Sequence, residues 1–192
     1  MGELNPHRTY RLEGYLYPDT YYFYTDSSEA TVINKFLARF DEMFDERYKE
    51  SCEAVGMTVD EVIILASMIQ MEGKYISEYG AISSVFHNRL NNPSYETMGF
   101  LNSDATIQYA LNERKSVLTS EDTELDSPYN TYEHKGLPPG PICCPSLDAM
   151  NYAMYPDDTK YYYFVSRTNG YSLFAETAEE HTQNIIDARS GQ

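Results

Sequence analysis

The sequence has little positive charge and no long apolar run, and each shortage excludes a class of protein. Only 14 lysines and arginines stand against 30 acidic residues, which gives a net charge of −16. Nucleic acids and anionic lipids require clustered basic side chains, so neither is expected as a partner. The longest apolar run, residues 62–69, is far shorter than the about 20 residues that cross a bilayer, and no signal peptide is visible.

Cysteine and the common catalytic fingerprints are scarce as well. Cys52 stands alone and Cys143 and Cys144 are adjacent, an odd set that forms neither a disulfide framework nor a zinc-binding spacing. The four histidines also lack metal-ligand spacing. No nucleophile elbow, P-loop or dinucleotide fingerprint is present, so nucleophilic serine, phosphoryl and hydride chemistry lack support. No metal or other cofactor is expected. The adjacent cysteines could hold a nucleophile, but no base is evident beside them.

Tyrosine, by contrast, is abundant, with 19 residues and no tryptophan. A tyrosine ring stacks on sugars or peptides while its hydroxyl forms hydrogen bonds, so a tyrosine-lined cleft is one interpretation. The other is that tyrosine is the favoured aromatic of the core. With 192 residues, 42% of them hydrophobic, the chain is long enough for one domain with a real core.

Local signals predict an α+β fold in which helices pack with a small antiparallel hairpin. An apolar stripe predicts a helix over residues 29–48. Thr58 and Glu61 form a capping box that opens a second helix over residues 59–72, with Gly73 available as its stop. Further helices are predicted over residues 79–90, after Asp104 as an N-cap, and from Ser146 to Met154.

The C-terminal part contains the hairpin. Two aromatic stretches, residues 161–166 and 171–176, are joined through Asn169-Gly170, a strong turn signal. A second capping box then opens a last helix toward Ala188, formed by Thr177 and Glu180. Residues 115–145 form a long loop with five prolines from Pro128 onward, and loops of this length are usually functional or disordered. The tyrosines and prolines favour a functional loop.

Glu72 is the first candidate for chemistry. The residues three, four, seven and eight positions before it are all apolar: Ile69, Met68, Leu65 and Ile64. Glu72 therefore lies on the stripe expected to be buried, where desolvation and the negative helix C-terminus both raise a carboxyl pKa. A carboxyl that stays protonated near neutral pH can act as a general acid, as in glycosidic bond cleavage. The alternative is that Glu72 turns to solvent or pairs with Lys74. Asp104 could be a second catalytic carboxylate, although N-capping is the preferred interpretation.

Six stretches in series resemble the YceG-like family, the MltG-type endolytic murein transglycosylases. They spread from Leu12 to His181 and read LEGYLYPDTYYF, ILASMIQMEG, ISSVFHNRL, SDATIQYAL, SPYNTY followed by GLPPGPI, and FAETAEEH. The resemblance implies a protein anchored in the cytoplasmic membrane by an N-terminal helix and acting outside it. Family members cut nascent peptidoglycan between N-acetylmuramic acid and N-acetylglucosamine and leave 1,6-anhydro ends. This cleavage would terminate glycan elongation, with penicillin-binding proteins or other synthases as partners.

The resemblance also assigns residues. It implies that Glu72 is the catalytic residue, at the end of a core helix, and that Gln70 stands where many members have a second glutamate. It implies that the following residues bind substrate: Gln70, Asn88, Ser103, Asp104, Tyr129, Asn130 and Tyr132. No metal or cofactor is implied.

The resemblance sets the expected domain boundaries. Residues 1–11 are interpreted as a linker or the remnant of a LysM-like region, and residues 12–192 as the catalytic domain. Three positions depart from the family pattern: Cys144, Ser146 and Ser172. Two other functions remain open, a non-catalytic peptidoglycan-binding module and a plain glycoside hydrolase that uses Glu72 with Asp104.

Overall fold

The computed structural model describes residues 5–93 and 95–190. These ranges contain a series of helices followed by one hairpin and a last helix, which confirms the predicted α+β fold. The order is α1 (Glu29–Met43), α2 (Glu46–Ala54), α3 (Val59–Glu72), the 3₁₀ turn η1 (Ile76–Glu78), α4 (Tyr79–Asn91), α5 (Asp104–Leu111), α6 (Ser120–Thr123), α7 (Leu147–Met154), β1 (Tyr163–Ser166), β2 (Ser172–Ala175) and α8 (Ala178–Ser190).

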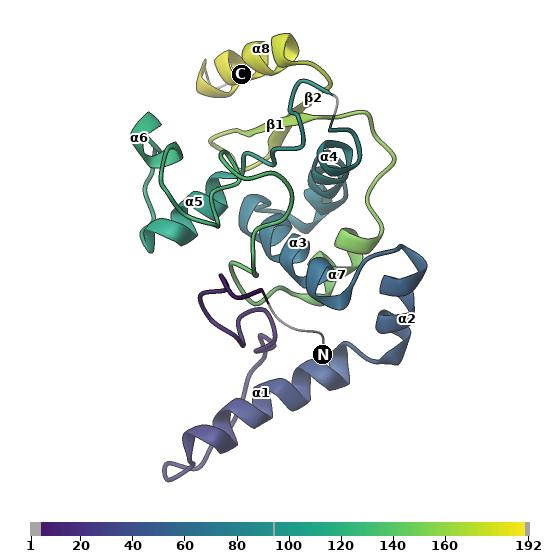
Figure 1. Ribbon diagram of the computed structural model, residues 1–192, viewed down its shortest axis with the longest axis vertical. Coiled ribbons are helices and arrows are strands. Elements are labelled where there is room, and N and C mark those ends of the chain that lie inside the picture. The colour runs from purple at the N-terminus through teal and green to yellow at the C-terminus, as the bar shows by residue number, and fades with distance from the viewer. Residues whose placement is uncertain (1–4, 94, 191–192) are drawn as a thin grey trace.

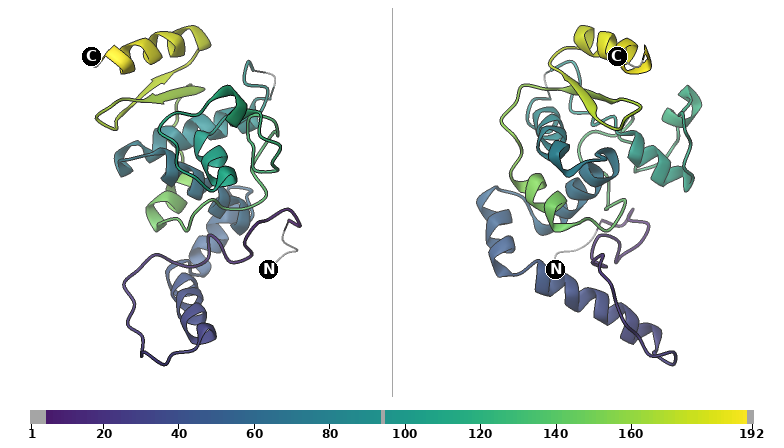
Figure 2. Two further views of the ribbon diagram at one scale, coloured as in Figure 1. Left: turned by 90° about the vertical axis from the view of Figure 1, so that its left-hand side faces the viewer. Right: turned by 180° about the vertical axis from the view of Figure 1, so that it is seen from behind.

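Helix α3 forms the centre of the molecule (Figure 1). It packs against α7, α4 and α5, while α8 covers the hairpin at one end and α1 projects from the other (Figures 1 and 2). Within the described ranges, none of the helices combines the length and the apolar character that crossing a bilayer requires.

The position of α3 follows from its sequence. All eight residues from Val62 to Ile69 are buried, so the helix is covered on every side rather than along one stripe. The predicted capping box is confirmed, since the Glu61 N–H donates to Thr58 Oγ1 at 3.2 Å and the Thr58 N–H donates to the Glu61 carboxylate at 2.8 Å. Gly73 follows the helix, and a Cβ there would lie 2.8 Å from the Tyr79 ring.

The single helix predicted over residues 29–48 is wrong, because the chain forms α1 and α2 with a break between them. Phe44 ends α1 with φ −102° and ψ 67°, and the Asp45 carboxylate accepts the Arg47 N–H at 3.0 Å to open α2. Phe44 is fully buried. The apolar stripe continues through the break, so hydrophobic periodicity does not reveal it.

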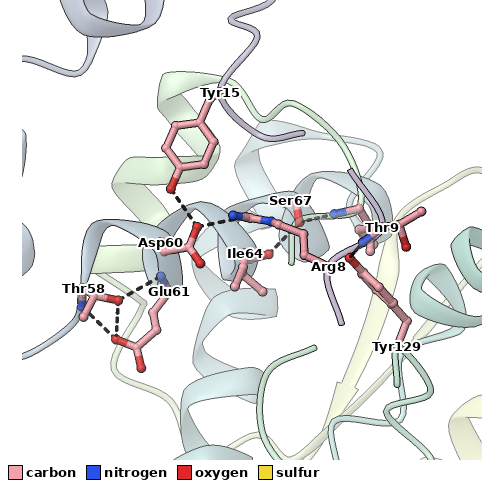
Figure 3. A network of polar contacts seen from close by, with 10 residues as sticks. Arg8, Thr9, Tyr15, Thr58, Asp60, Glu61, Ile64, Ser67 and Tyr129 are labelled. Atoms are coloured by element: carbon pink, nitrogen blue, oxygen red, sulfur yellow. Dashed lines mark hydrogen bonds and ion pairs between the residues drawn. The ribbon is translucent and has the colours of Figure 1, made fainter. Parts of the chain in front are cut away.

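The N-terminal segment packs against the first turn of α3 (Figure 3). The Arg8 side chain is 2% exposed, and its Nη2 lies 2.9 Å from Asp60 Oδ1. The same oxygen accepts the Tyr15 hydroxyl at 2.7 Å. Of the predicted linker, residues 1–4 lie outside the described residues, as do residues 191 and 192 of the predicted catalytic domain.

The long loop contains one element that was not predicted. Helix α6 is opened by a capping box in which the Asp122 N–H donates to Thr119 Oγ1 at 3.3 Å. Much of the remaining loop is buried, including Tyr129, Asn130 and Thr131. The loop is therefore part of the packed domain.

The hairpin and the last helix are confirmed. Tyr163 pairs with Ala175 and Ser166 with Ser172, and Gly170 in the turn adopts φ +88°, which glycine accommodates without strain. The hairpin tip contacts the segment that follows α3, since the Tyr75 ring stacks on Tyr171 with 4.3 Å between centroids. This contact makes the hairpin a neighbour of Glu72.

Candidate active site

Two adjoining pockets meet at Glu72. The first has a volume of about 420 Å³, and the second, of about 870 Å³, extends toward the hairpin and α8. Glu72, Asp104 and Ser116 line both, so together the pockets form one open groove with Glu72 in its middle. A third pocket, of about 250 Å³, continues the first and shares Met71, Ala105, Gln108 and Arg114 with it.

Glu72 joins the end of α3 to the start of α5. Its Oε1 accepts two hydrogen bonds, from the Ser103 hydroxyl at 2.5 Å and from the Ala105 N–H at 3.2 Å. Oε2 has no hydrogen-bond partner among the described residues. When the carboxyl is neutral, the proton therefore belongs on Oε2, because both donors face Oε1.

The pKa of Glu72 is raised above its ordinary value. Burial is the largest cause, because it disfavours the charged form, and the negative charge of Asp104 acts in the same direction. The hydrogen bonds from Ser103 and Ala105 and the positive charge of Arg89 oppose this rise without cancelling it. Lys74 does not pair with Glu72; its Nζ lies 3.4 Å from the Asn169 carbonyl oxygen.

The prediction that Asp104 caps α5 is wrong. The N-cap position is Ser103, and its side chain makes no cap hydrogen bond. Ser103 donates to Glu72 instead, and Glu72 satisfies the free Ala105 N–H, so a carboxyl from another helix caps α5. Asp104 is exposed, and its Oδ1 accepts the Tyr132 hydroxyl at 2.6 Å.

Three of the residues predicted to bind substrate thus surround the groove beside Glu72: Ser103, Asp104 and Tyr132. Ser103 contacts the carboxyl directly, and Tyr132 lines the larger pocket together with Asp104.

The other four are used elsewhere in the fold. Gln70 Oε1 accepts the Ser146 N–H at 2.7 Å and so joins α3 to α7. Asn88 donates to two carbonyls, those of Thr159 and Tyr161, at 3.0 and 2.9 Å.

Tyr129 and Asn130 are buried and form hydrogen bonds that stabilise the long loop. The Tyr129 oxygen accepts the Thr9 N–H at 3.2 Å. Asn130 is fully buried, and its amide donates to the Thr123 and Leu125 carbonyls at 3.0 and 2.9 Å. Neither residue lines the groove around Glu72.

Sequence reasoning missed Arg89, which lines the larger pocket. Its guanidinium is buried and donates to the carbonyls of Tyr162 and Leu101. Burial lowers the pKa of Arg89 to about 10, so the group remains charged at neutral pH. Its place in the stretch ISSVFHNRL, directly after Asn88, is the signal that could have found it.

His181 lines the same pocket. Its ring stacks on Tyr163 at 5.2 Å, and its Nδ1 is buried without a hydrogen-bond partner among the described residues. Burial lowers the pKa of His181, which favours the neutral ring.

The cysteine pair does not offer a nucleophile. Cys143 Sγ contacts the Ser67 carbonyl at 3.5 Å, and burial raises the pKa of Cys143 to about 12, so the thiolate is scarce at neutral pH. Across residues 5–93 and 95–190, no three His, Cys, Asp or Glu side chains gather as a metal site would require.

The other two residues that depart from the family pattern, Ser146 and Ser172, form hydrogen bonds within the fold. Ser146 is the N-cap of α7, as predicted, and accepts the Ala149 N–H at 3.3 Å. The Ser172 N–H donates to Glu78 Oε1 at 2.7 Å and ties β2 to η1.

The arrangement fits acid chemistry on a bound polymer. An open groove allows a long strand to pass, and a carboxyl with a raised pKa at its centre is the group that protonates the leaving oxygen in glycosidic cleavage. Enzymes that cleave glycosidic bonds are therefore the class that the site indicates.

Comparison with known proteins places the chain within a family. The profile of the YceG-like family matches residues 3–187, and the chain belongs to this family. Two curated relatives, from Bacillus subtilis strain 168 and Streptococcus pneumoniae serotype 2 strain D39, are named endolytic murein transglycosylase. The first is 35% identical over 172 residues, which are 90% of this chain and 46% of the relative. The second is 33% identical over 181 residues, which are 93% of this chain and 32% of the relative.

A solved structure has the same fold. The crystal structure of a YceG-like protein from Listeria monocytogenes superposes with a TM-score of 0.86 at 39% identity, over 93% of this chain and 57% of that one. The chain thus spans about half of the Bacillus relative and about a third of the Streptococcus relative.

Proposed function

We propose that this chain is the catalytic part of a lytic transglycosylase that cleaves the glycan strands of peptidoglycan. The observation that carries the proposal is the Glu72 carboxyl, which lies in an open groove, has a raised pKa, and has one oxygen without a hydrogen-bond partner among the described residues. The names of the two curated relatives support peptidoglycan as the substrate.

The first step uses Glu72 as an acid. A strand lies along the groove with the bond between N-acetylmuramic acid and N-acetylglucosamine beside Glu72 Oε2. The proton on Oε2 passes to the glycosidic oxygen, the bond from this oxygen to C1 of the muramyl sugar breaks, and positive charge develops at C1.

The second step uses the same group as a base. Glu72 is now ionised and accepts the proton of the muramyl 6-hydroxyl as its oxygen attacks C1. The product end is a 1,6-anhydro sugar, no water is consumed, and Glu72 is again protonated. Because the substrate supplies the nucleophile, one carboxyl is sufficient, whereas most hydrolases use two.

Neutral and charged groups around Glu72 stabilise it between the two steps. The Ser103 hydroxyl and the Ala105 N–H already point at Oε1, and the Arg89 guanidinium contributes a positive charge nearby. These groups need no rearrangement when the carboxylate forms, which is the condition for electrostatic catalysis.

The biological setting is part of the proposal. Cleavage within nascent strands would end glycan elongation. The parent protein would be anchored in the cytoplasmic membrane by an N-terminal helix, act on its outer side, and work with peptidoglycan synthases. This rests on the resemblance of the motif series to the family.

A plain hydrolase is the second candidate, and one observation favours it. Asp104 does not cap α5; it lines the same groove as Glu72 and is oriented by Tyr132. A carboxylate in this place could activate a water molecule, with Glu72 as the acid.

Mass spectrometry of the products decides between these functions. Purified glycan strands incubated with the protein should yield fragments with 1,6-anhydro ends. Reducing ends would support hydrolysis with Asp104, and intact strands bound without cleavage would indicate a binding module.

A further inference from the structure

We propose that the loop after α5 forms a subsite for a carboxylate of the peptide attached to the glycan, with Arg114 as its binding group. This inference rests on the proposed function and concerns the part of the groove on the α5 side of Glu72.

The loop is held in place on both sides of Arg114. Before it, Asn112 ends α5 in the left-handed conformation with φ +52°, which turns the chain sharply. After it, the Lys115 carbonyl accepts the Gln108 side-chain amide at 3.3 Å. The Lys115 ammonium lies 2.6 Å from Asp122 Oδ1, a carboxylate that is 7% exposed. These bonds fix the backbone that presents Arg114.

The Arg114 side chain is available to bind a ligand. Its side chain is exposed and has no hydrogen bond, ion pair or ring contact with any described residue. It lines the pocket of about 420 Å³ that contains Glu72 and also the adjoining pocket of about 250 Å³. A guanidinium in this state can bind a carboxylate with two parallel hydrogen bonds.

The neighbouring charged groups leave the guanidinium available for an anionic ligand. Lys115 is paired with Asp122 and so does not compete with Arg114 for such a ligand, and the Asp104 carboxylate accepts the Tyr132 hydroxyl and forms no ion pair with Arg114 among the described residues. Glu113 lines only the smaller outer pocket, whereas Arg114 also reaches the pocket of Glu72. The raised pKa of Glu72 favours its neutral form, which the proposed mechanism requires when substrate binds and which does not repel a carboxylate.

The substrate supplies such a group. The muramyl sugar carries a peptide on its lactyl substituent, and this peptide bears free carboxylates close to the cleaved bond. The whole chain has a net charge of −16 and repels an anionic polymer at long range. Arg114, which has no partner among the described residues and lines the pocket of Glu72, therefore gives peptide-bearing strands a favourable contact that bare glycan lacks.

The test compares two substrates on matched variants. Cleavage is measured on peptide-bearing strands and on the same strands after an amidase has removed the peptides. Arg114→Gln should lower kcat/KM on peptide-bearing strands about three- to tenfold, the range for one charge-assisted contact at a partly exposed site, and leave bare strands unchanged. Arg114→Lys should retain part of the preference, because it keeps the charge but loses the two-pronged geometry.

Arg47→Gln is the control. It removes the same charge from an exposed arginine on α2, which lies on the other side of the molecule from α5 and α6 (Figures 1 and 2). It should leave both substrates unaffected.

Binding measurements keep this test separate from the proposed cleavage. In the Glu72→Gln background, calorimetry should show that Arg114→Gln weakens binding of peptide-bearing strands only. Equal loss on both substrates, or no loss on either, would overturn the subsite. A parent protein that binds with this preference but cuts nothing would overturn the proposed function and leave the subsite standing. No binding and no cleavage would overturn both.

Discussion

Two acidic residues at opposite ends of α3 are compensated in different ways. Asp60, in the first turn, accepts hydrogen bonds from the Arg8 guanidinium at 2.9 Å and the Tyr15 hydroxyl at 2.7 Å (Figure 3). Glu72, in the last turn, accepts hydrogen bonds from two neutral donors, the Ser103 hydroxyl and the Ala105 N–H. Among residues 5–93 and 95–190, the first carboxyl is bonded to a buried cation and the second is not.

The difference separates a structural acid from one suited to exchange a proton. Asp60 forms an ion pair with Arg8. At Glu72 the hydrogen bonds from neutral donors oppose the effect of burial without cancelling it, so burial prevails and raises the pKa of Glu72. The same helix thus carries an ion pair that joins the N-terminal segment to the core and, at its other end, a carboxyl that lines a groove and can exchange a proton there.

Removing the carboxyl of Glu72 should have the largest effect. Glu72→Gln should slow cleavage of glycan strands by about 10²–10⁴-fold or more, because the amide cannot donate an acidic proton. The melting temperature should stay near that of the parent, since the amide oxygen still accepts from Ser103 and Ala105. Kinetics and melting curves of the purified variant test this, and near-full activity would refute the assignment.

Asp60→Asn should have the opposite profile. Arg8 is 2% exposed at its side chain and would lose its counter-charge, which should cost about 2–3 kcal/mol of unfolding free energy. The folded fraction should retain kcat on glycan strands. Urea unfolding with activity measured below the transition gives both quantities, and a loss of kcat without a loss of stability would remove the distinction between the two ends.

Two tyrosines that donate to carboxylates allow a matched comparison. Tyr15 donates to Asp60 at the start of α3, and Tyr132 donates to Asp104, which lines the groove of Glu72. Tyr132→Phe frees Asp104 in the groove and should lower kcat/KM about three- to tenfold with little change in melting temperature. Tyr15→Phe removes one of the two hydrogen bonds to Asp60 and leaves that of Arg8, so it should cost about 1 kcal/mol of unfolding free energy with unchanged kinetics. If the two variants behaved alike, the hydroxyls would have equivalent roles.

The smallest effect is on the pH dependence of stability. Because the folded pKa of Glu72 is raised, the folded state binds its proton more tightly than the unfolded state does. Its contribution to the free energy of unfolding is full at low pH and falls as pH rises through the raised pKa. Glu72→Gln should lack this decline and melt at or above the parent temperature at mildly alkaline pH. A variant clearly less stable than the parent there would mean that the carboxylate is stabilised by its partners.

Local signals predicted much of this fold. The capping boxes of Thr58 with Glu61 and of Thr177 with Glu180, the Ser146 cap and the Asn169-Gly170 turn all involve residues within a few positions, and each is present. The break between α1 and α2 at Phe44 was not predicted, because the apolar stripe runs through it. Asp45 followed by Glu46 was the available signal, since aspartate is a favoured N-cap.

The site depends on contacts that no local pattern encodes. Glu72 meets Ser103 and Ala105 across more than thirty positions, which turned the expected Asp104 cap into a cap by Glu72. Asn130 lies within a motif whose resemblance to the family implies substrate binding, yet its amide donates to backbone carbonyls of the loop. A sequence pattern indicates which residues matter to a family but does not separate those facing the groove from those that hold its wall.

The contact between the hairpin tip and the segment after Glu72 has a consequence for the order of folding. Tyr75 donates to the Asn169 carbonyl at 3.1 Å and Glu78 accepts the Ser172 N–H at 2.7 Å, each across 94 positions of sequence. Contacts between such distant segments form late, and a chain is synthesised from its N-terminus. Helix α3 can therefore form long before the strand that completes the groove exists. An unfinished chain would carry Glu72 without this wall of the groove, so the proposed cleavage would require the hairpin to have formed.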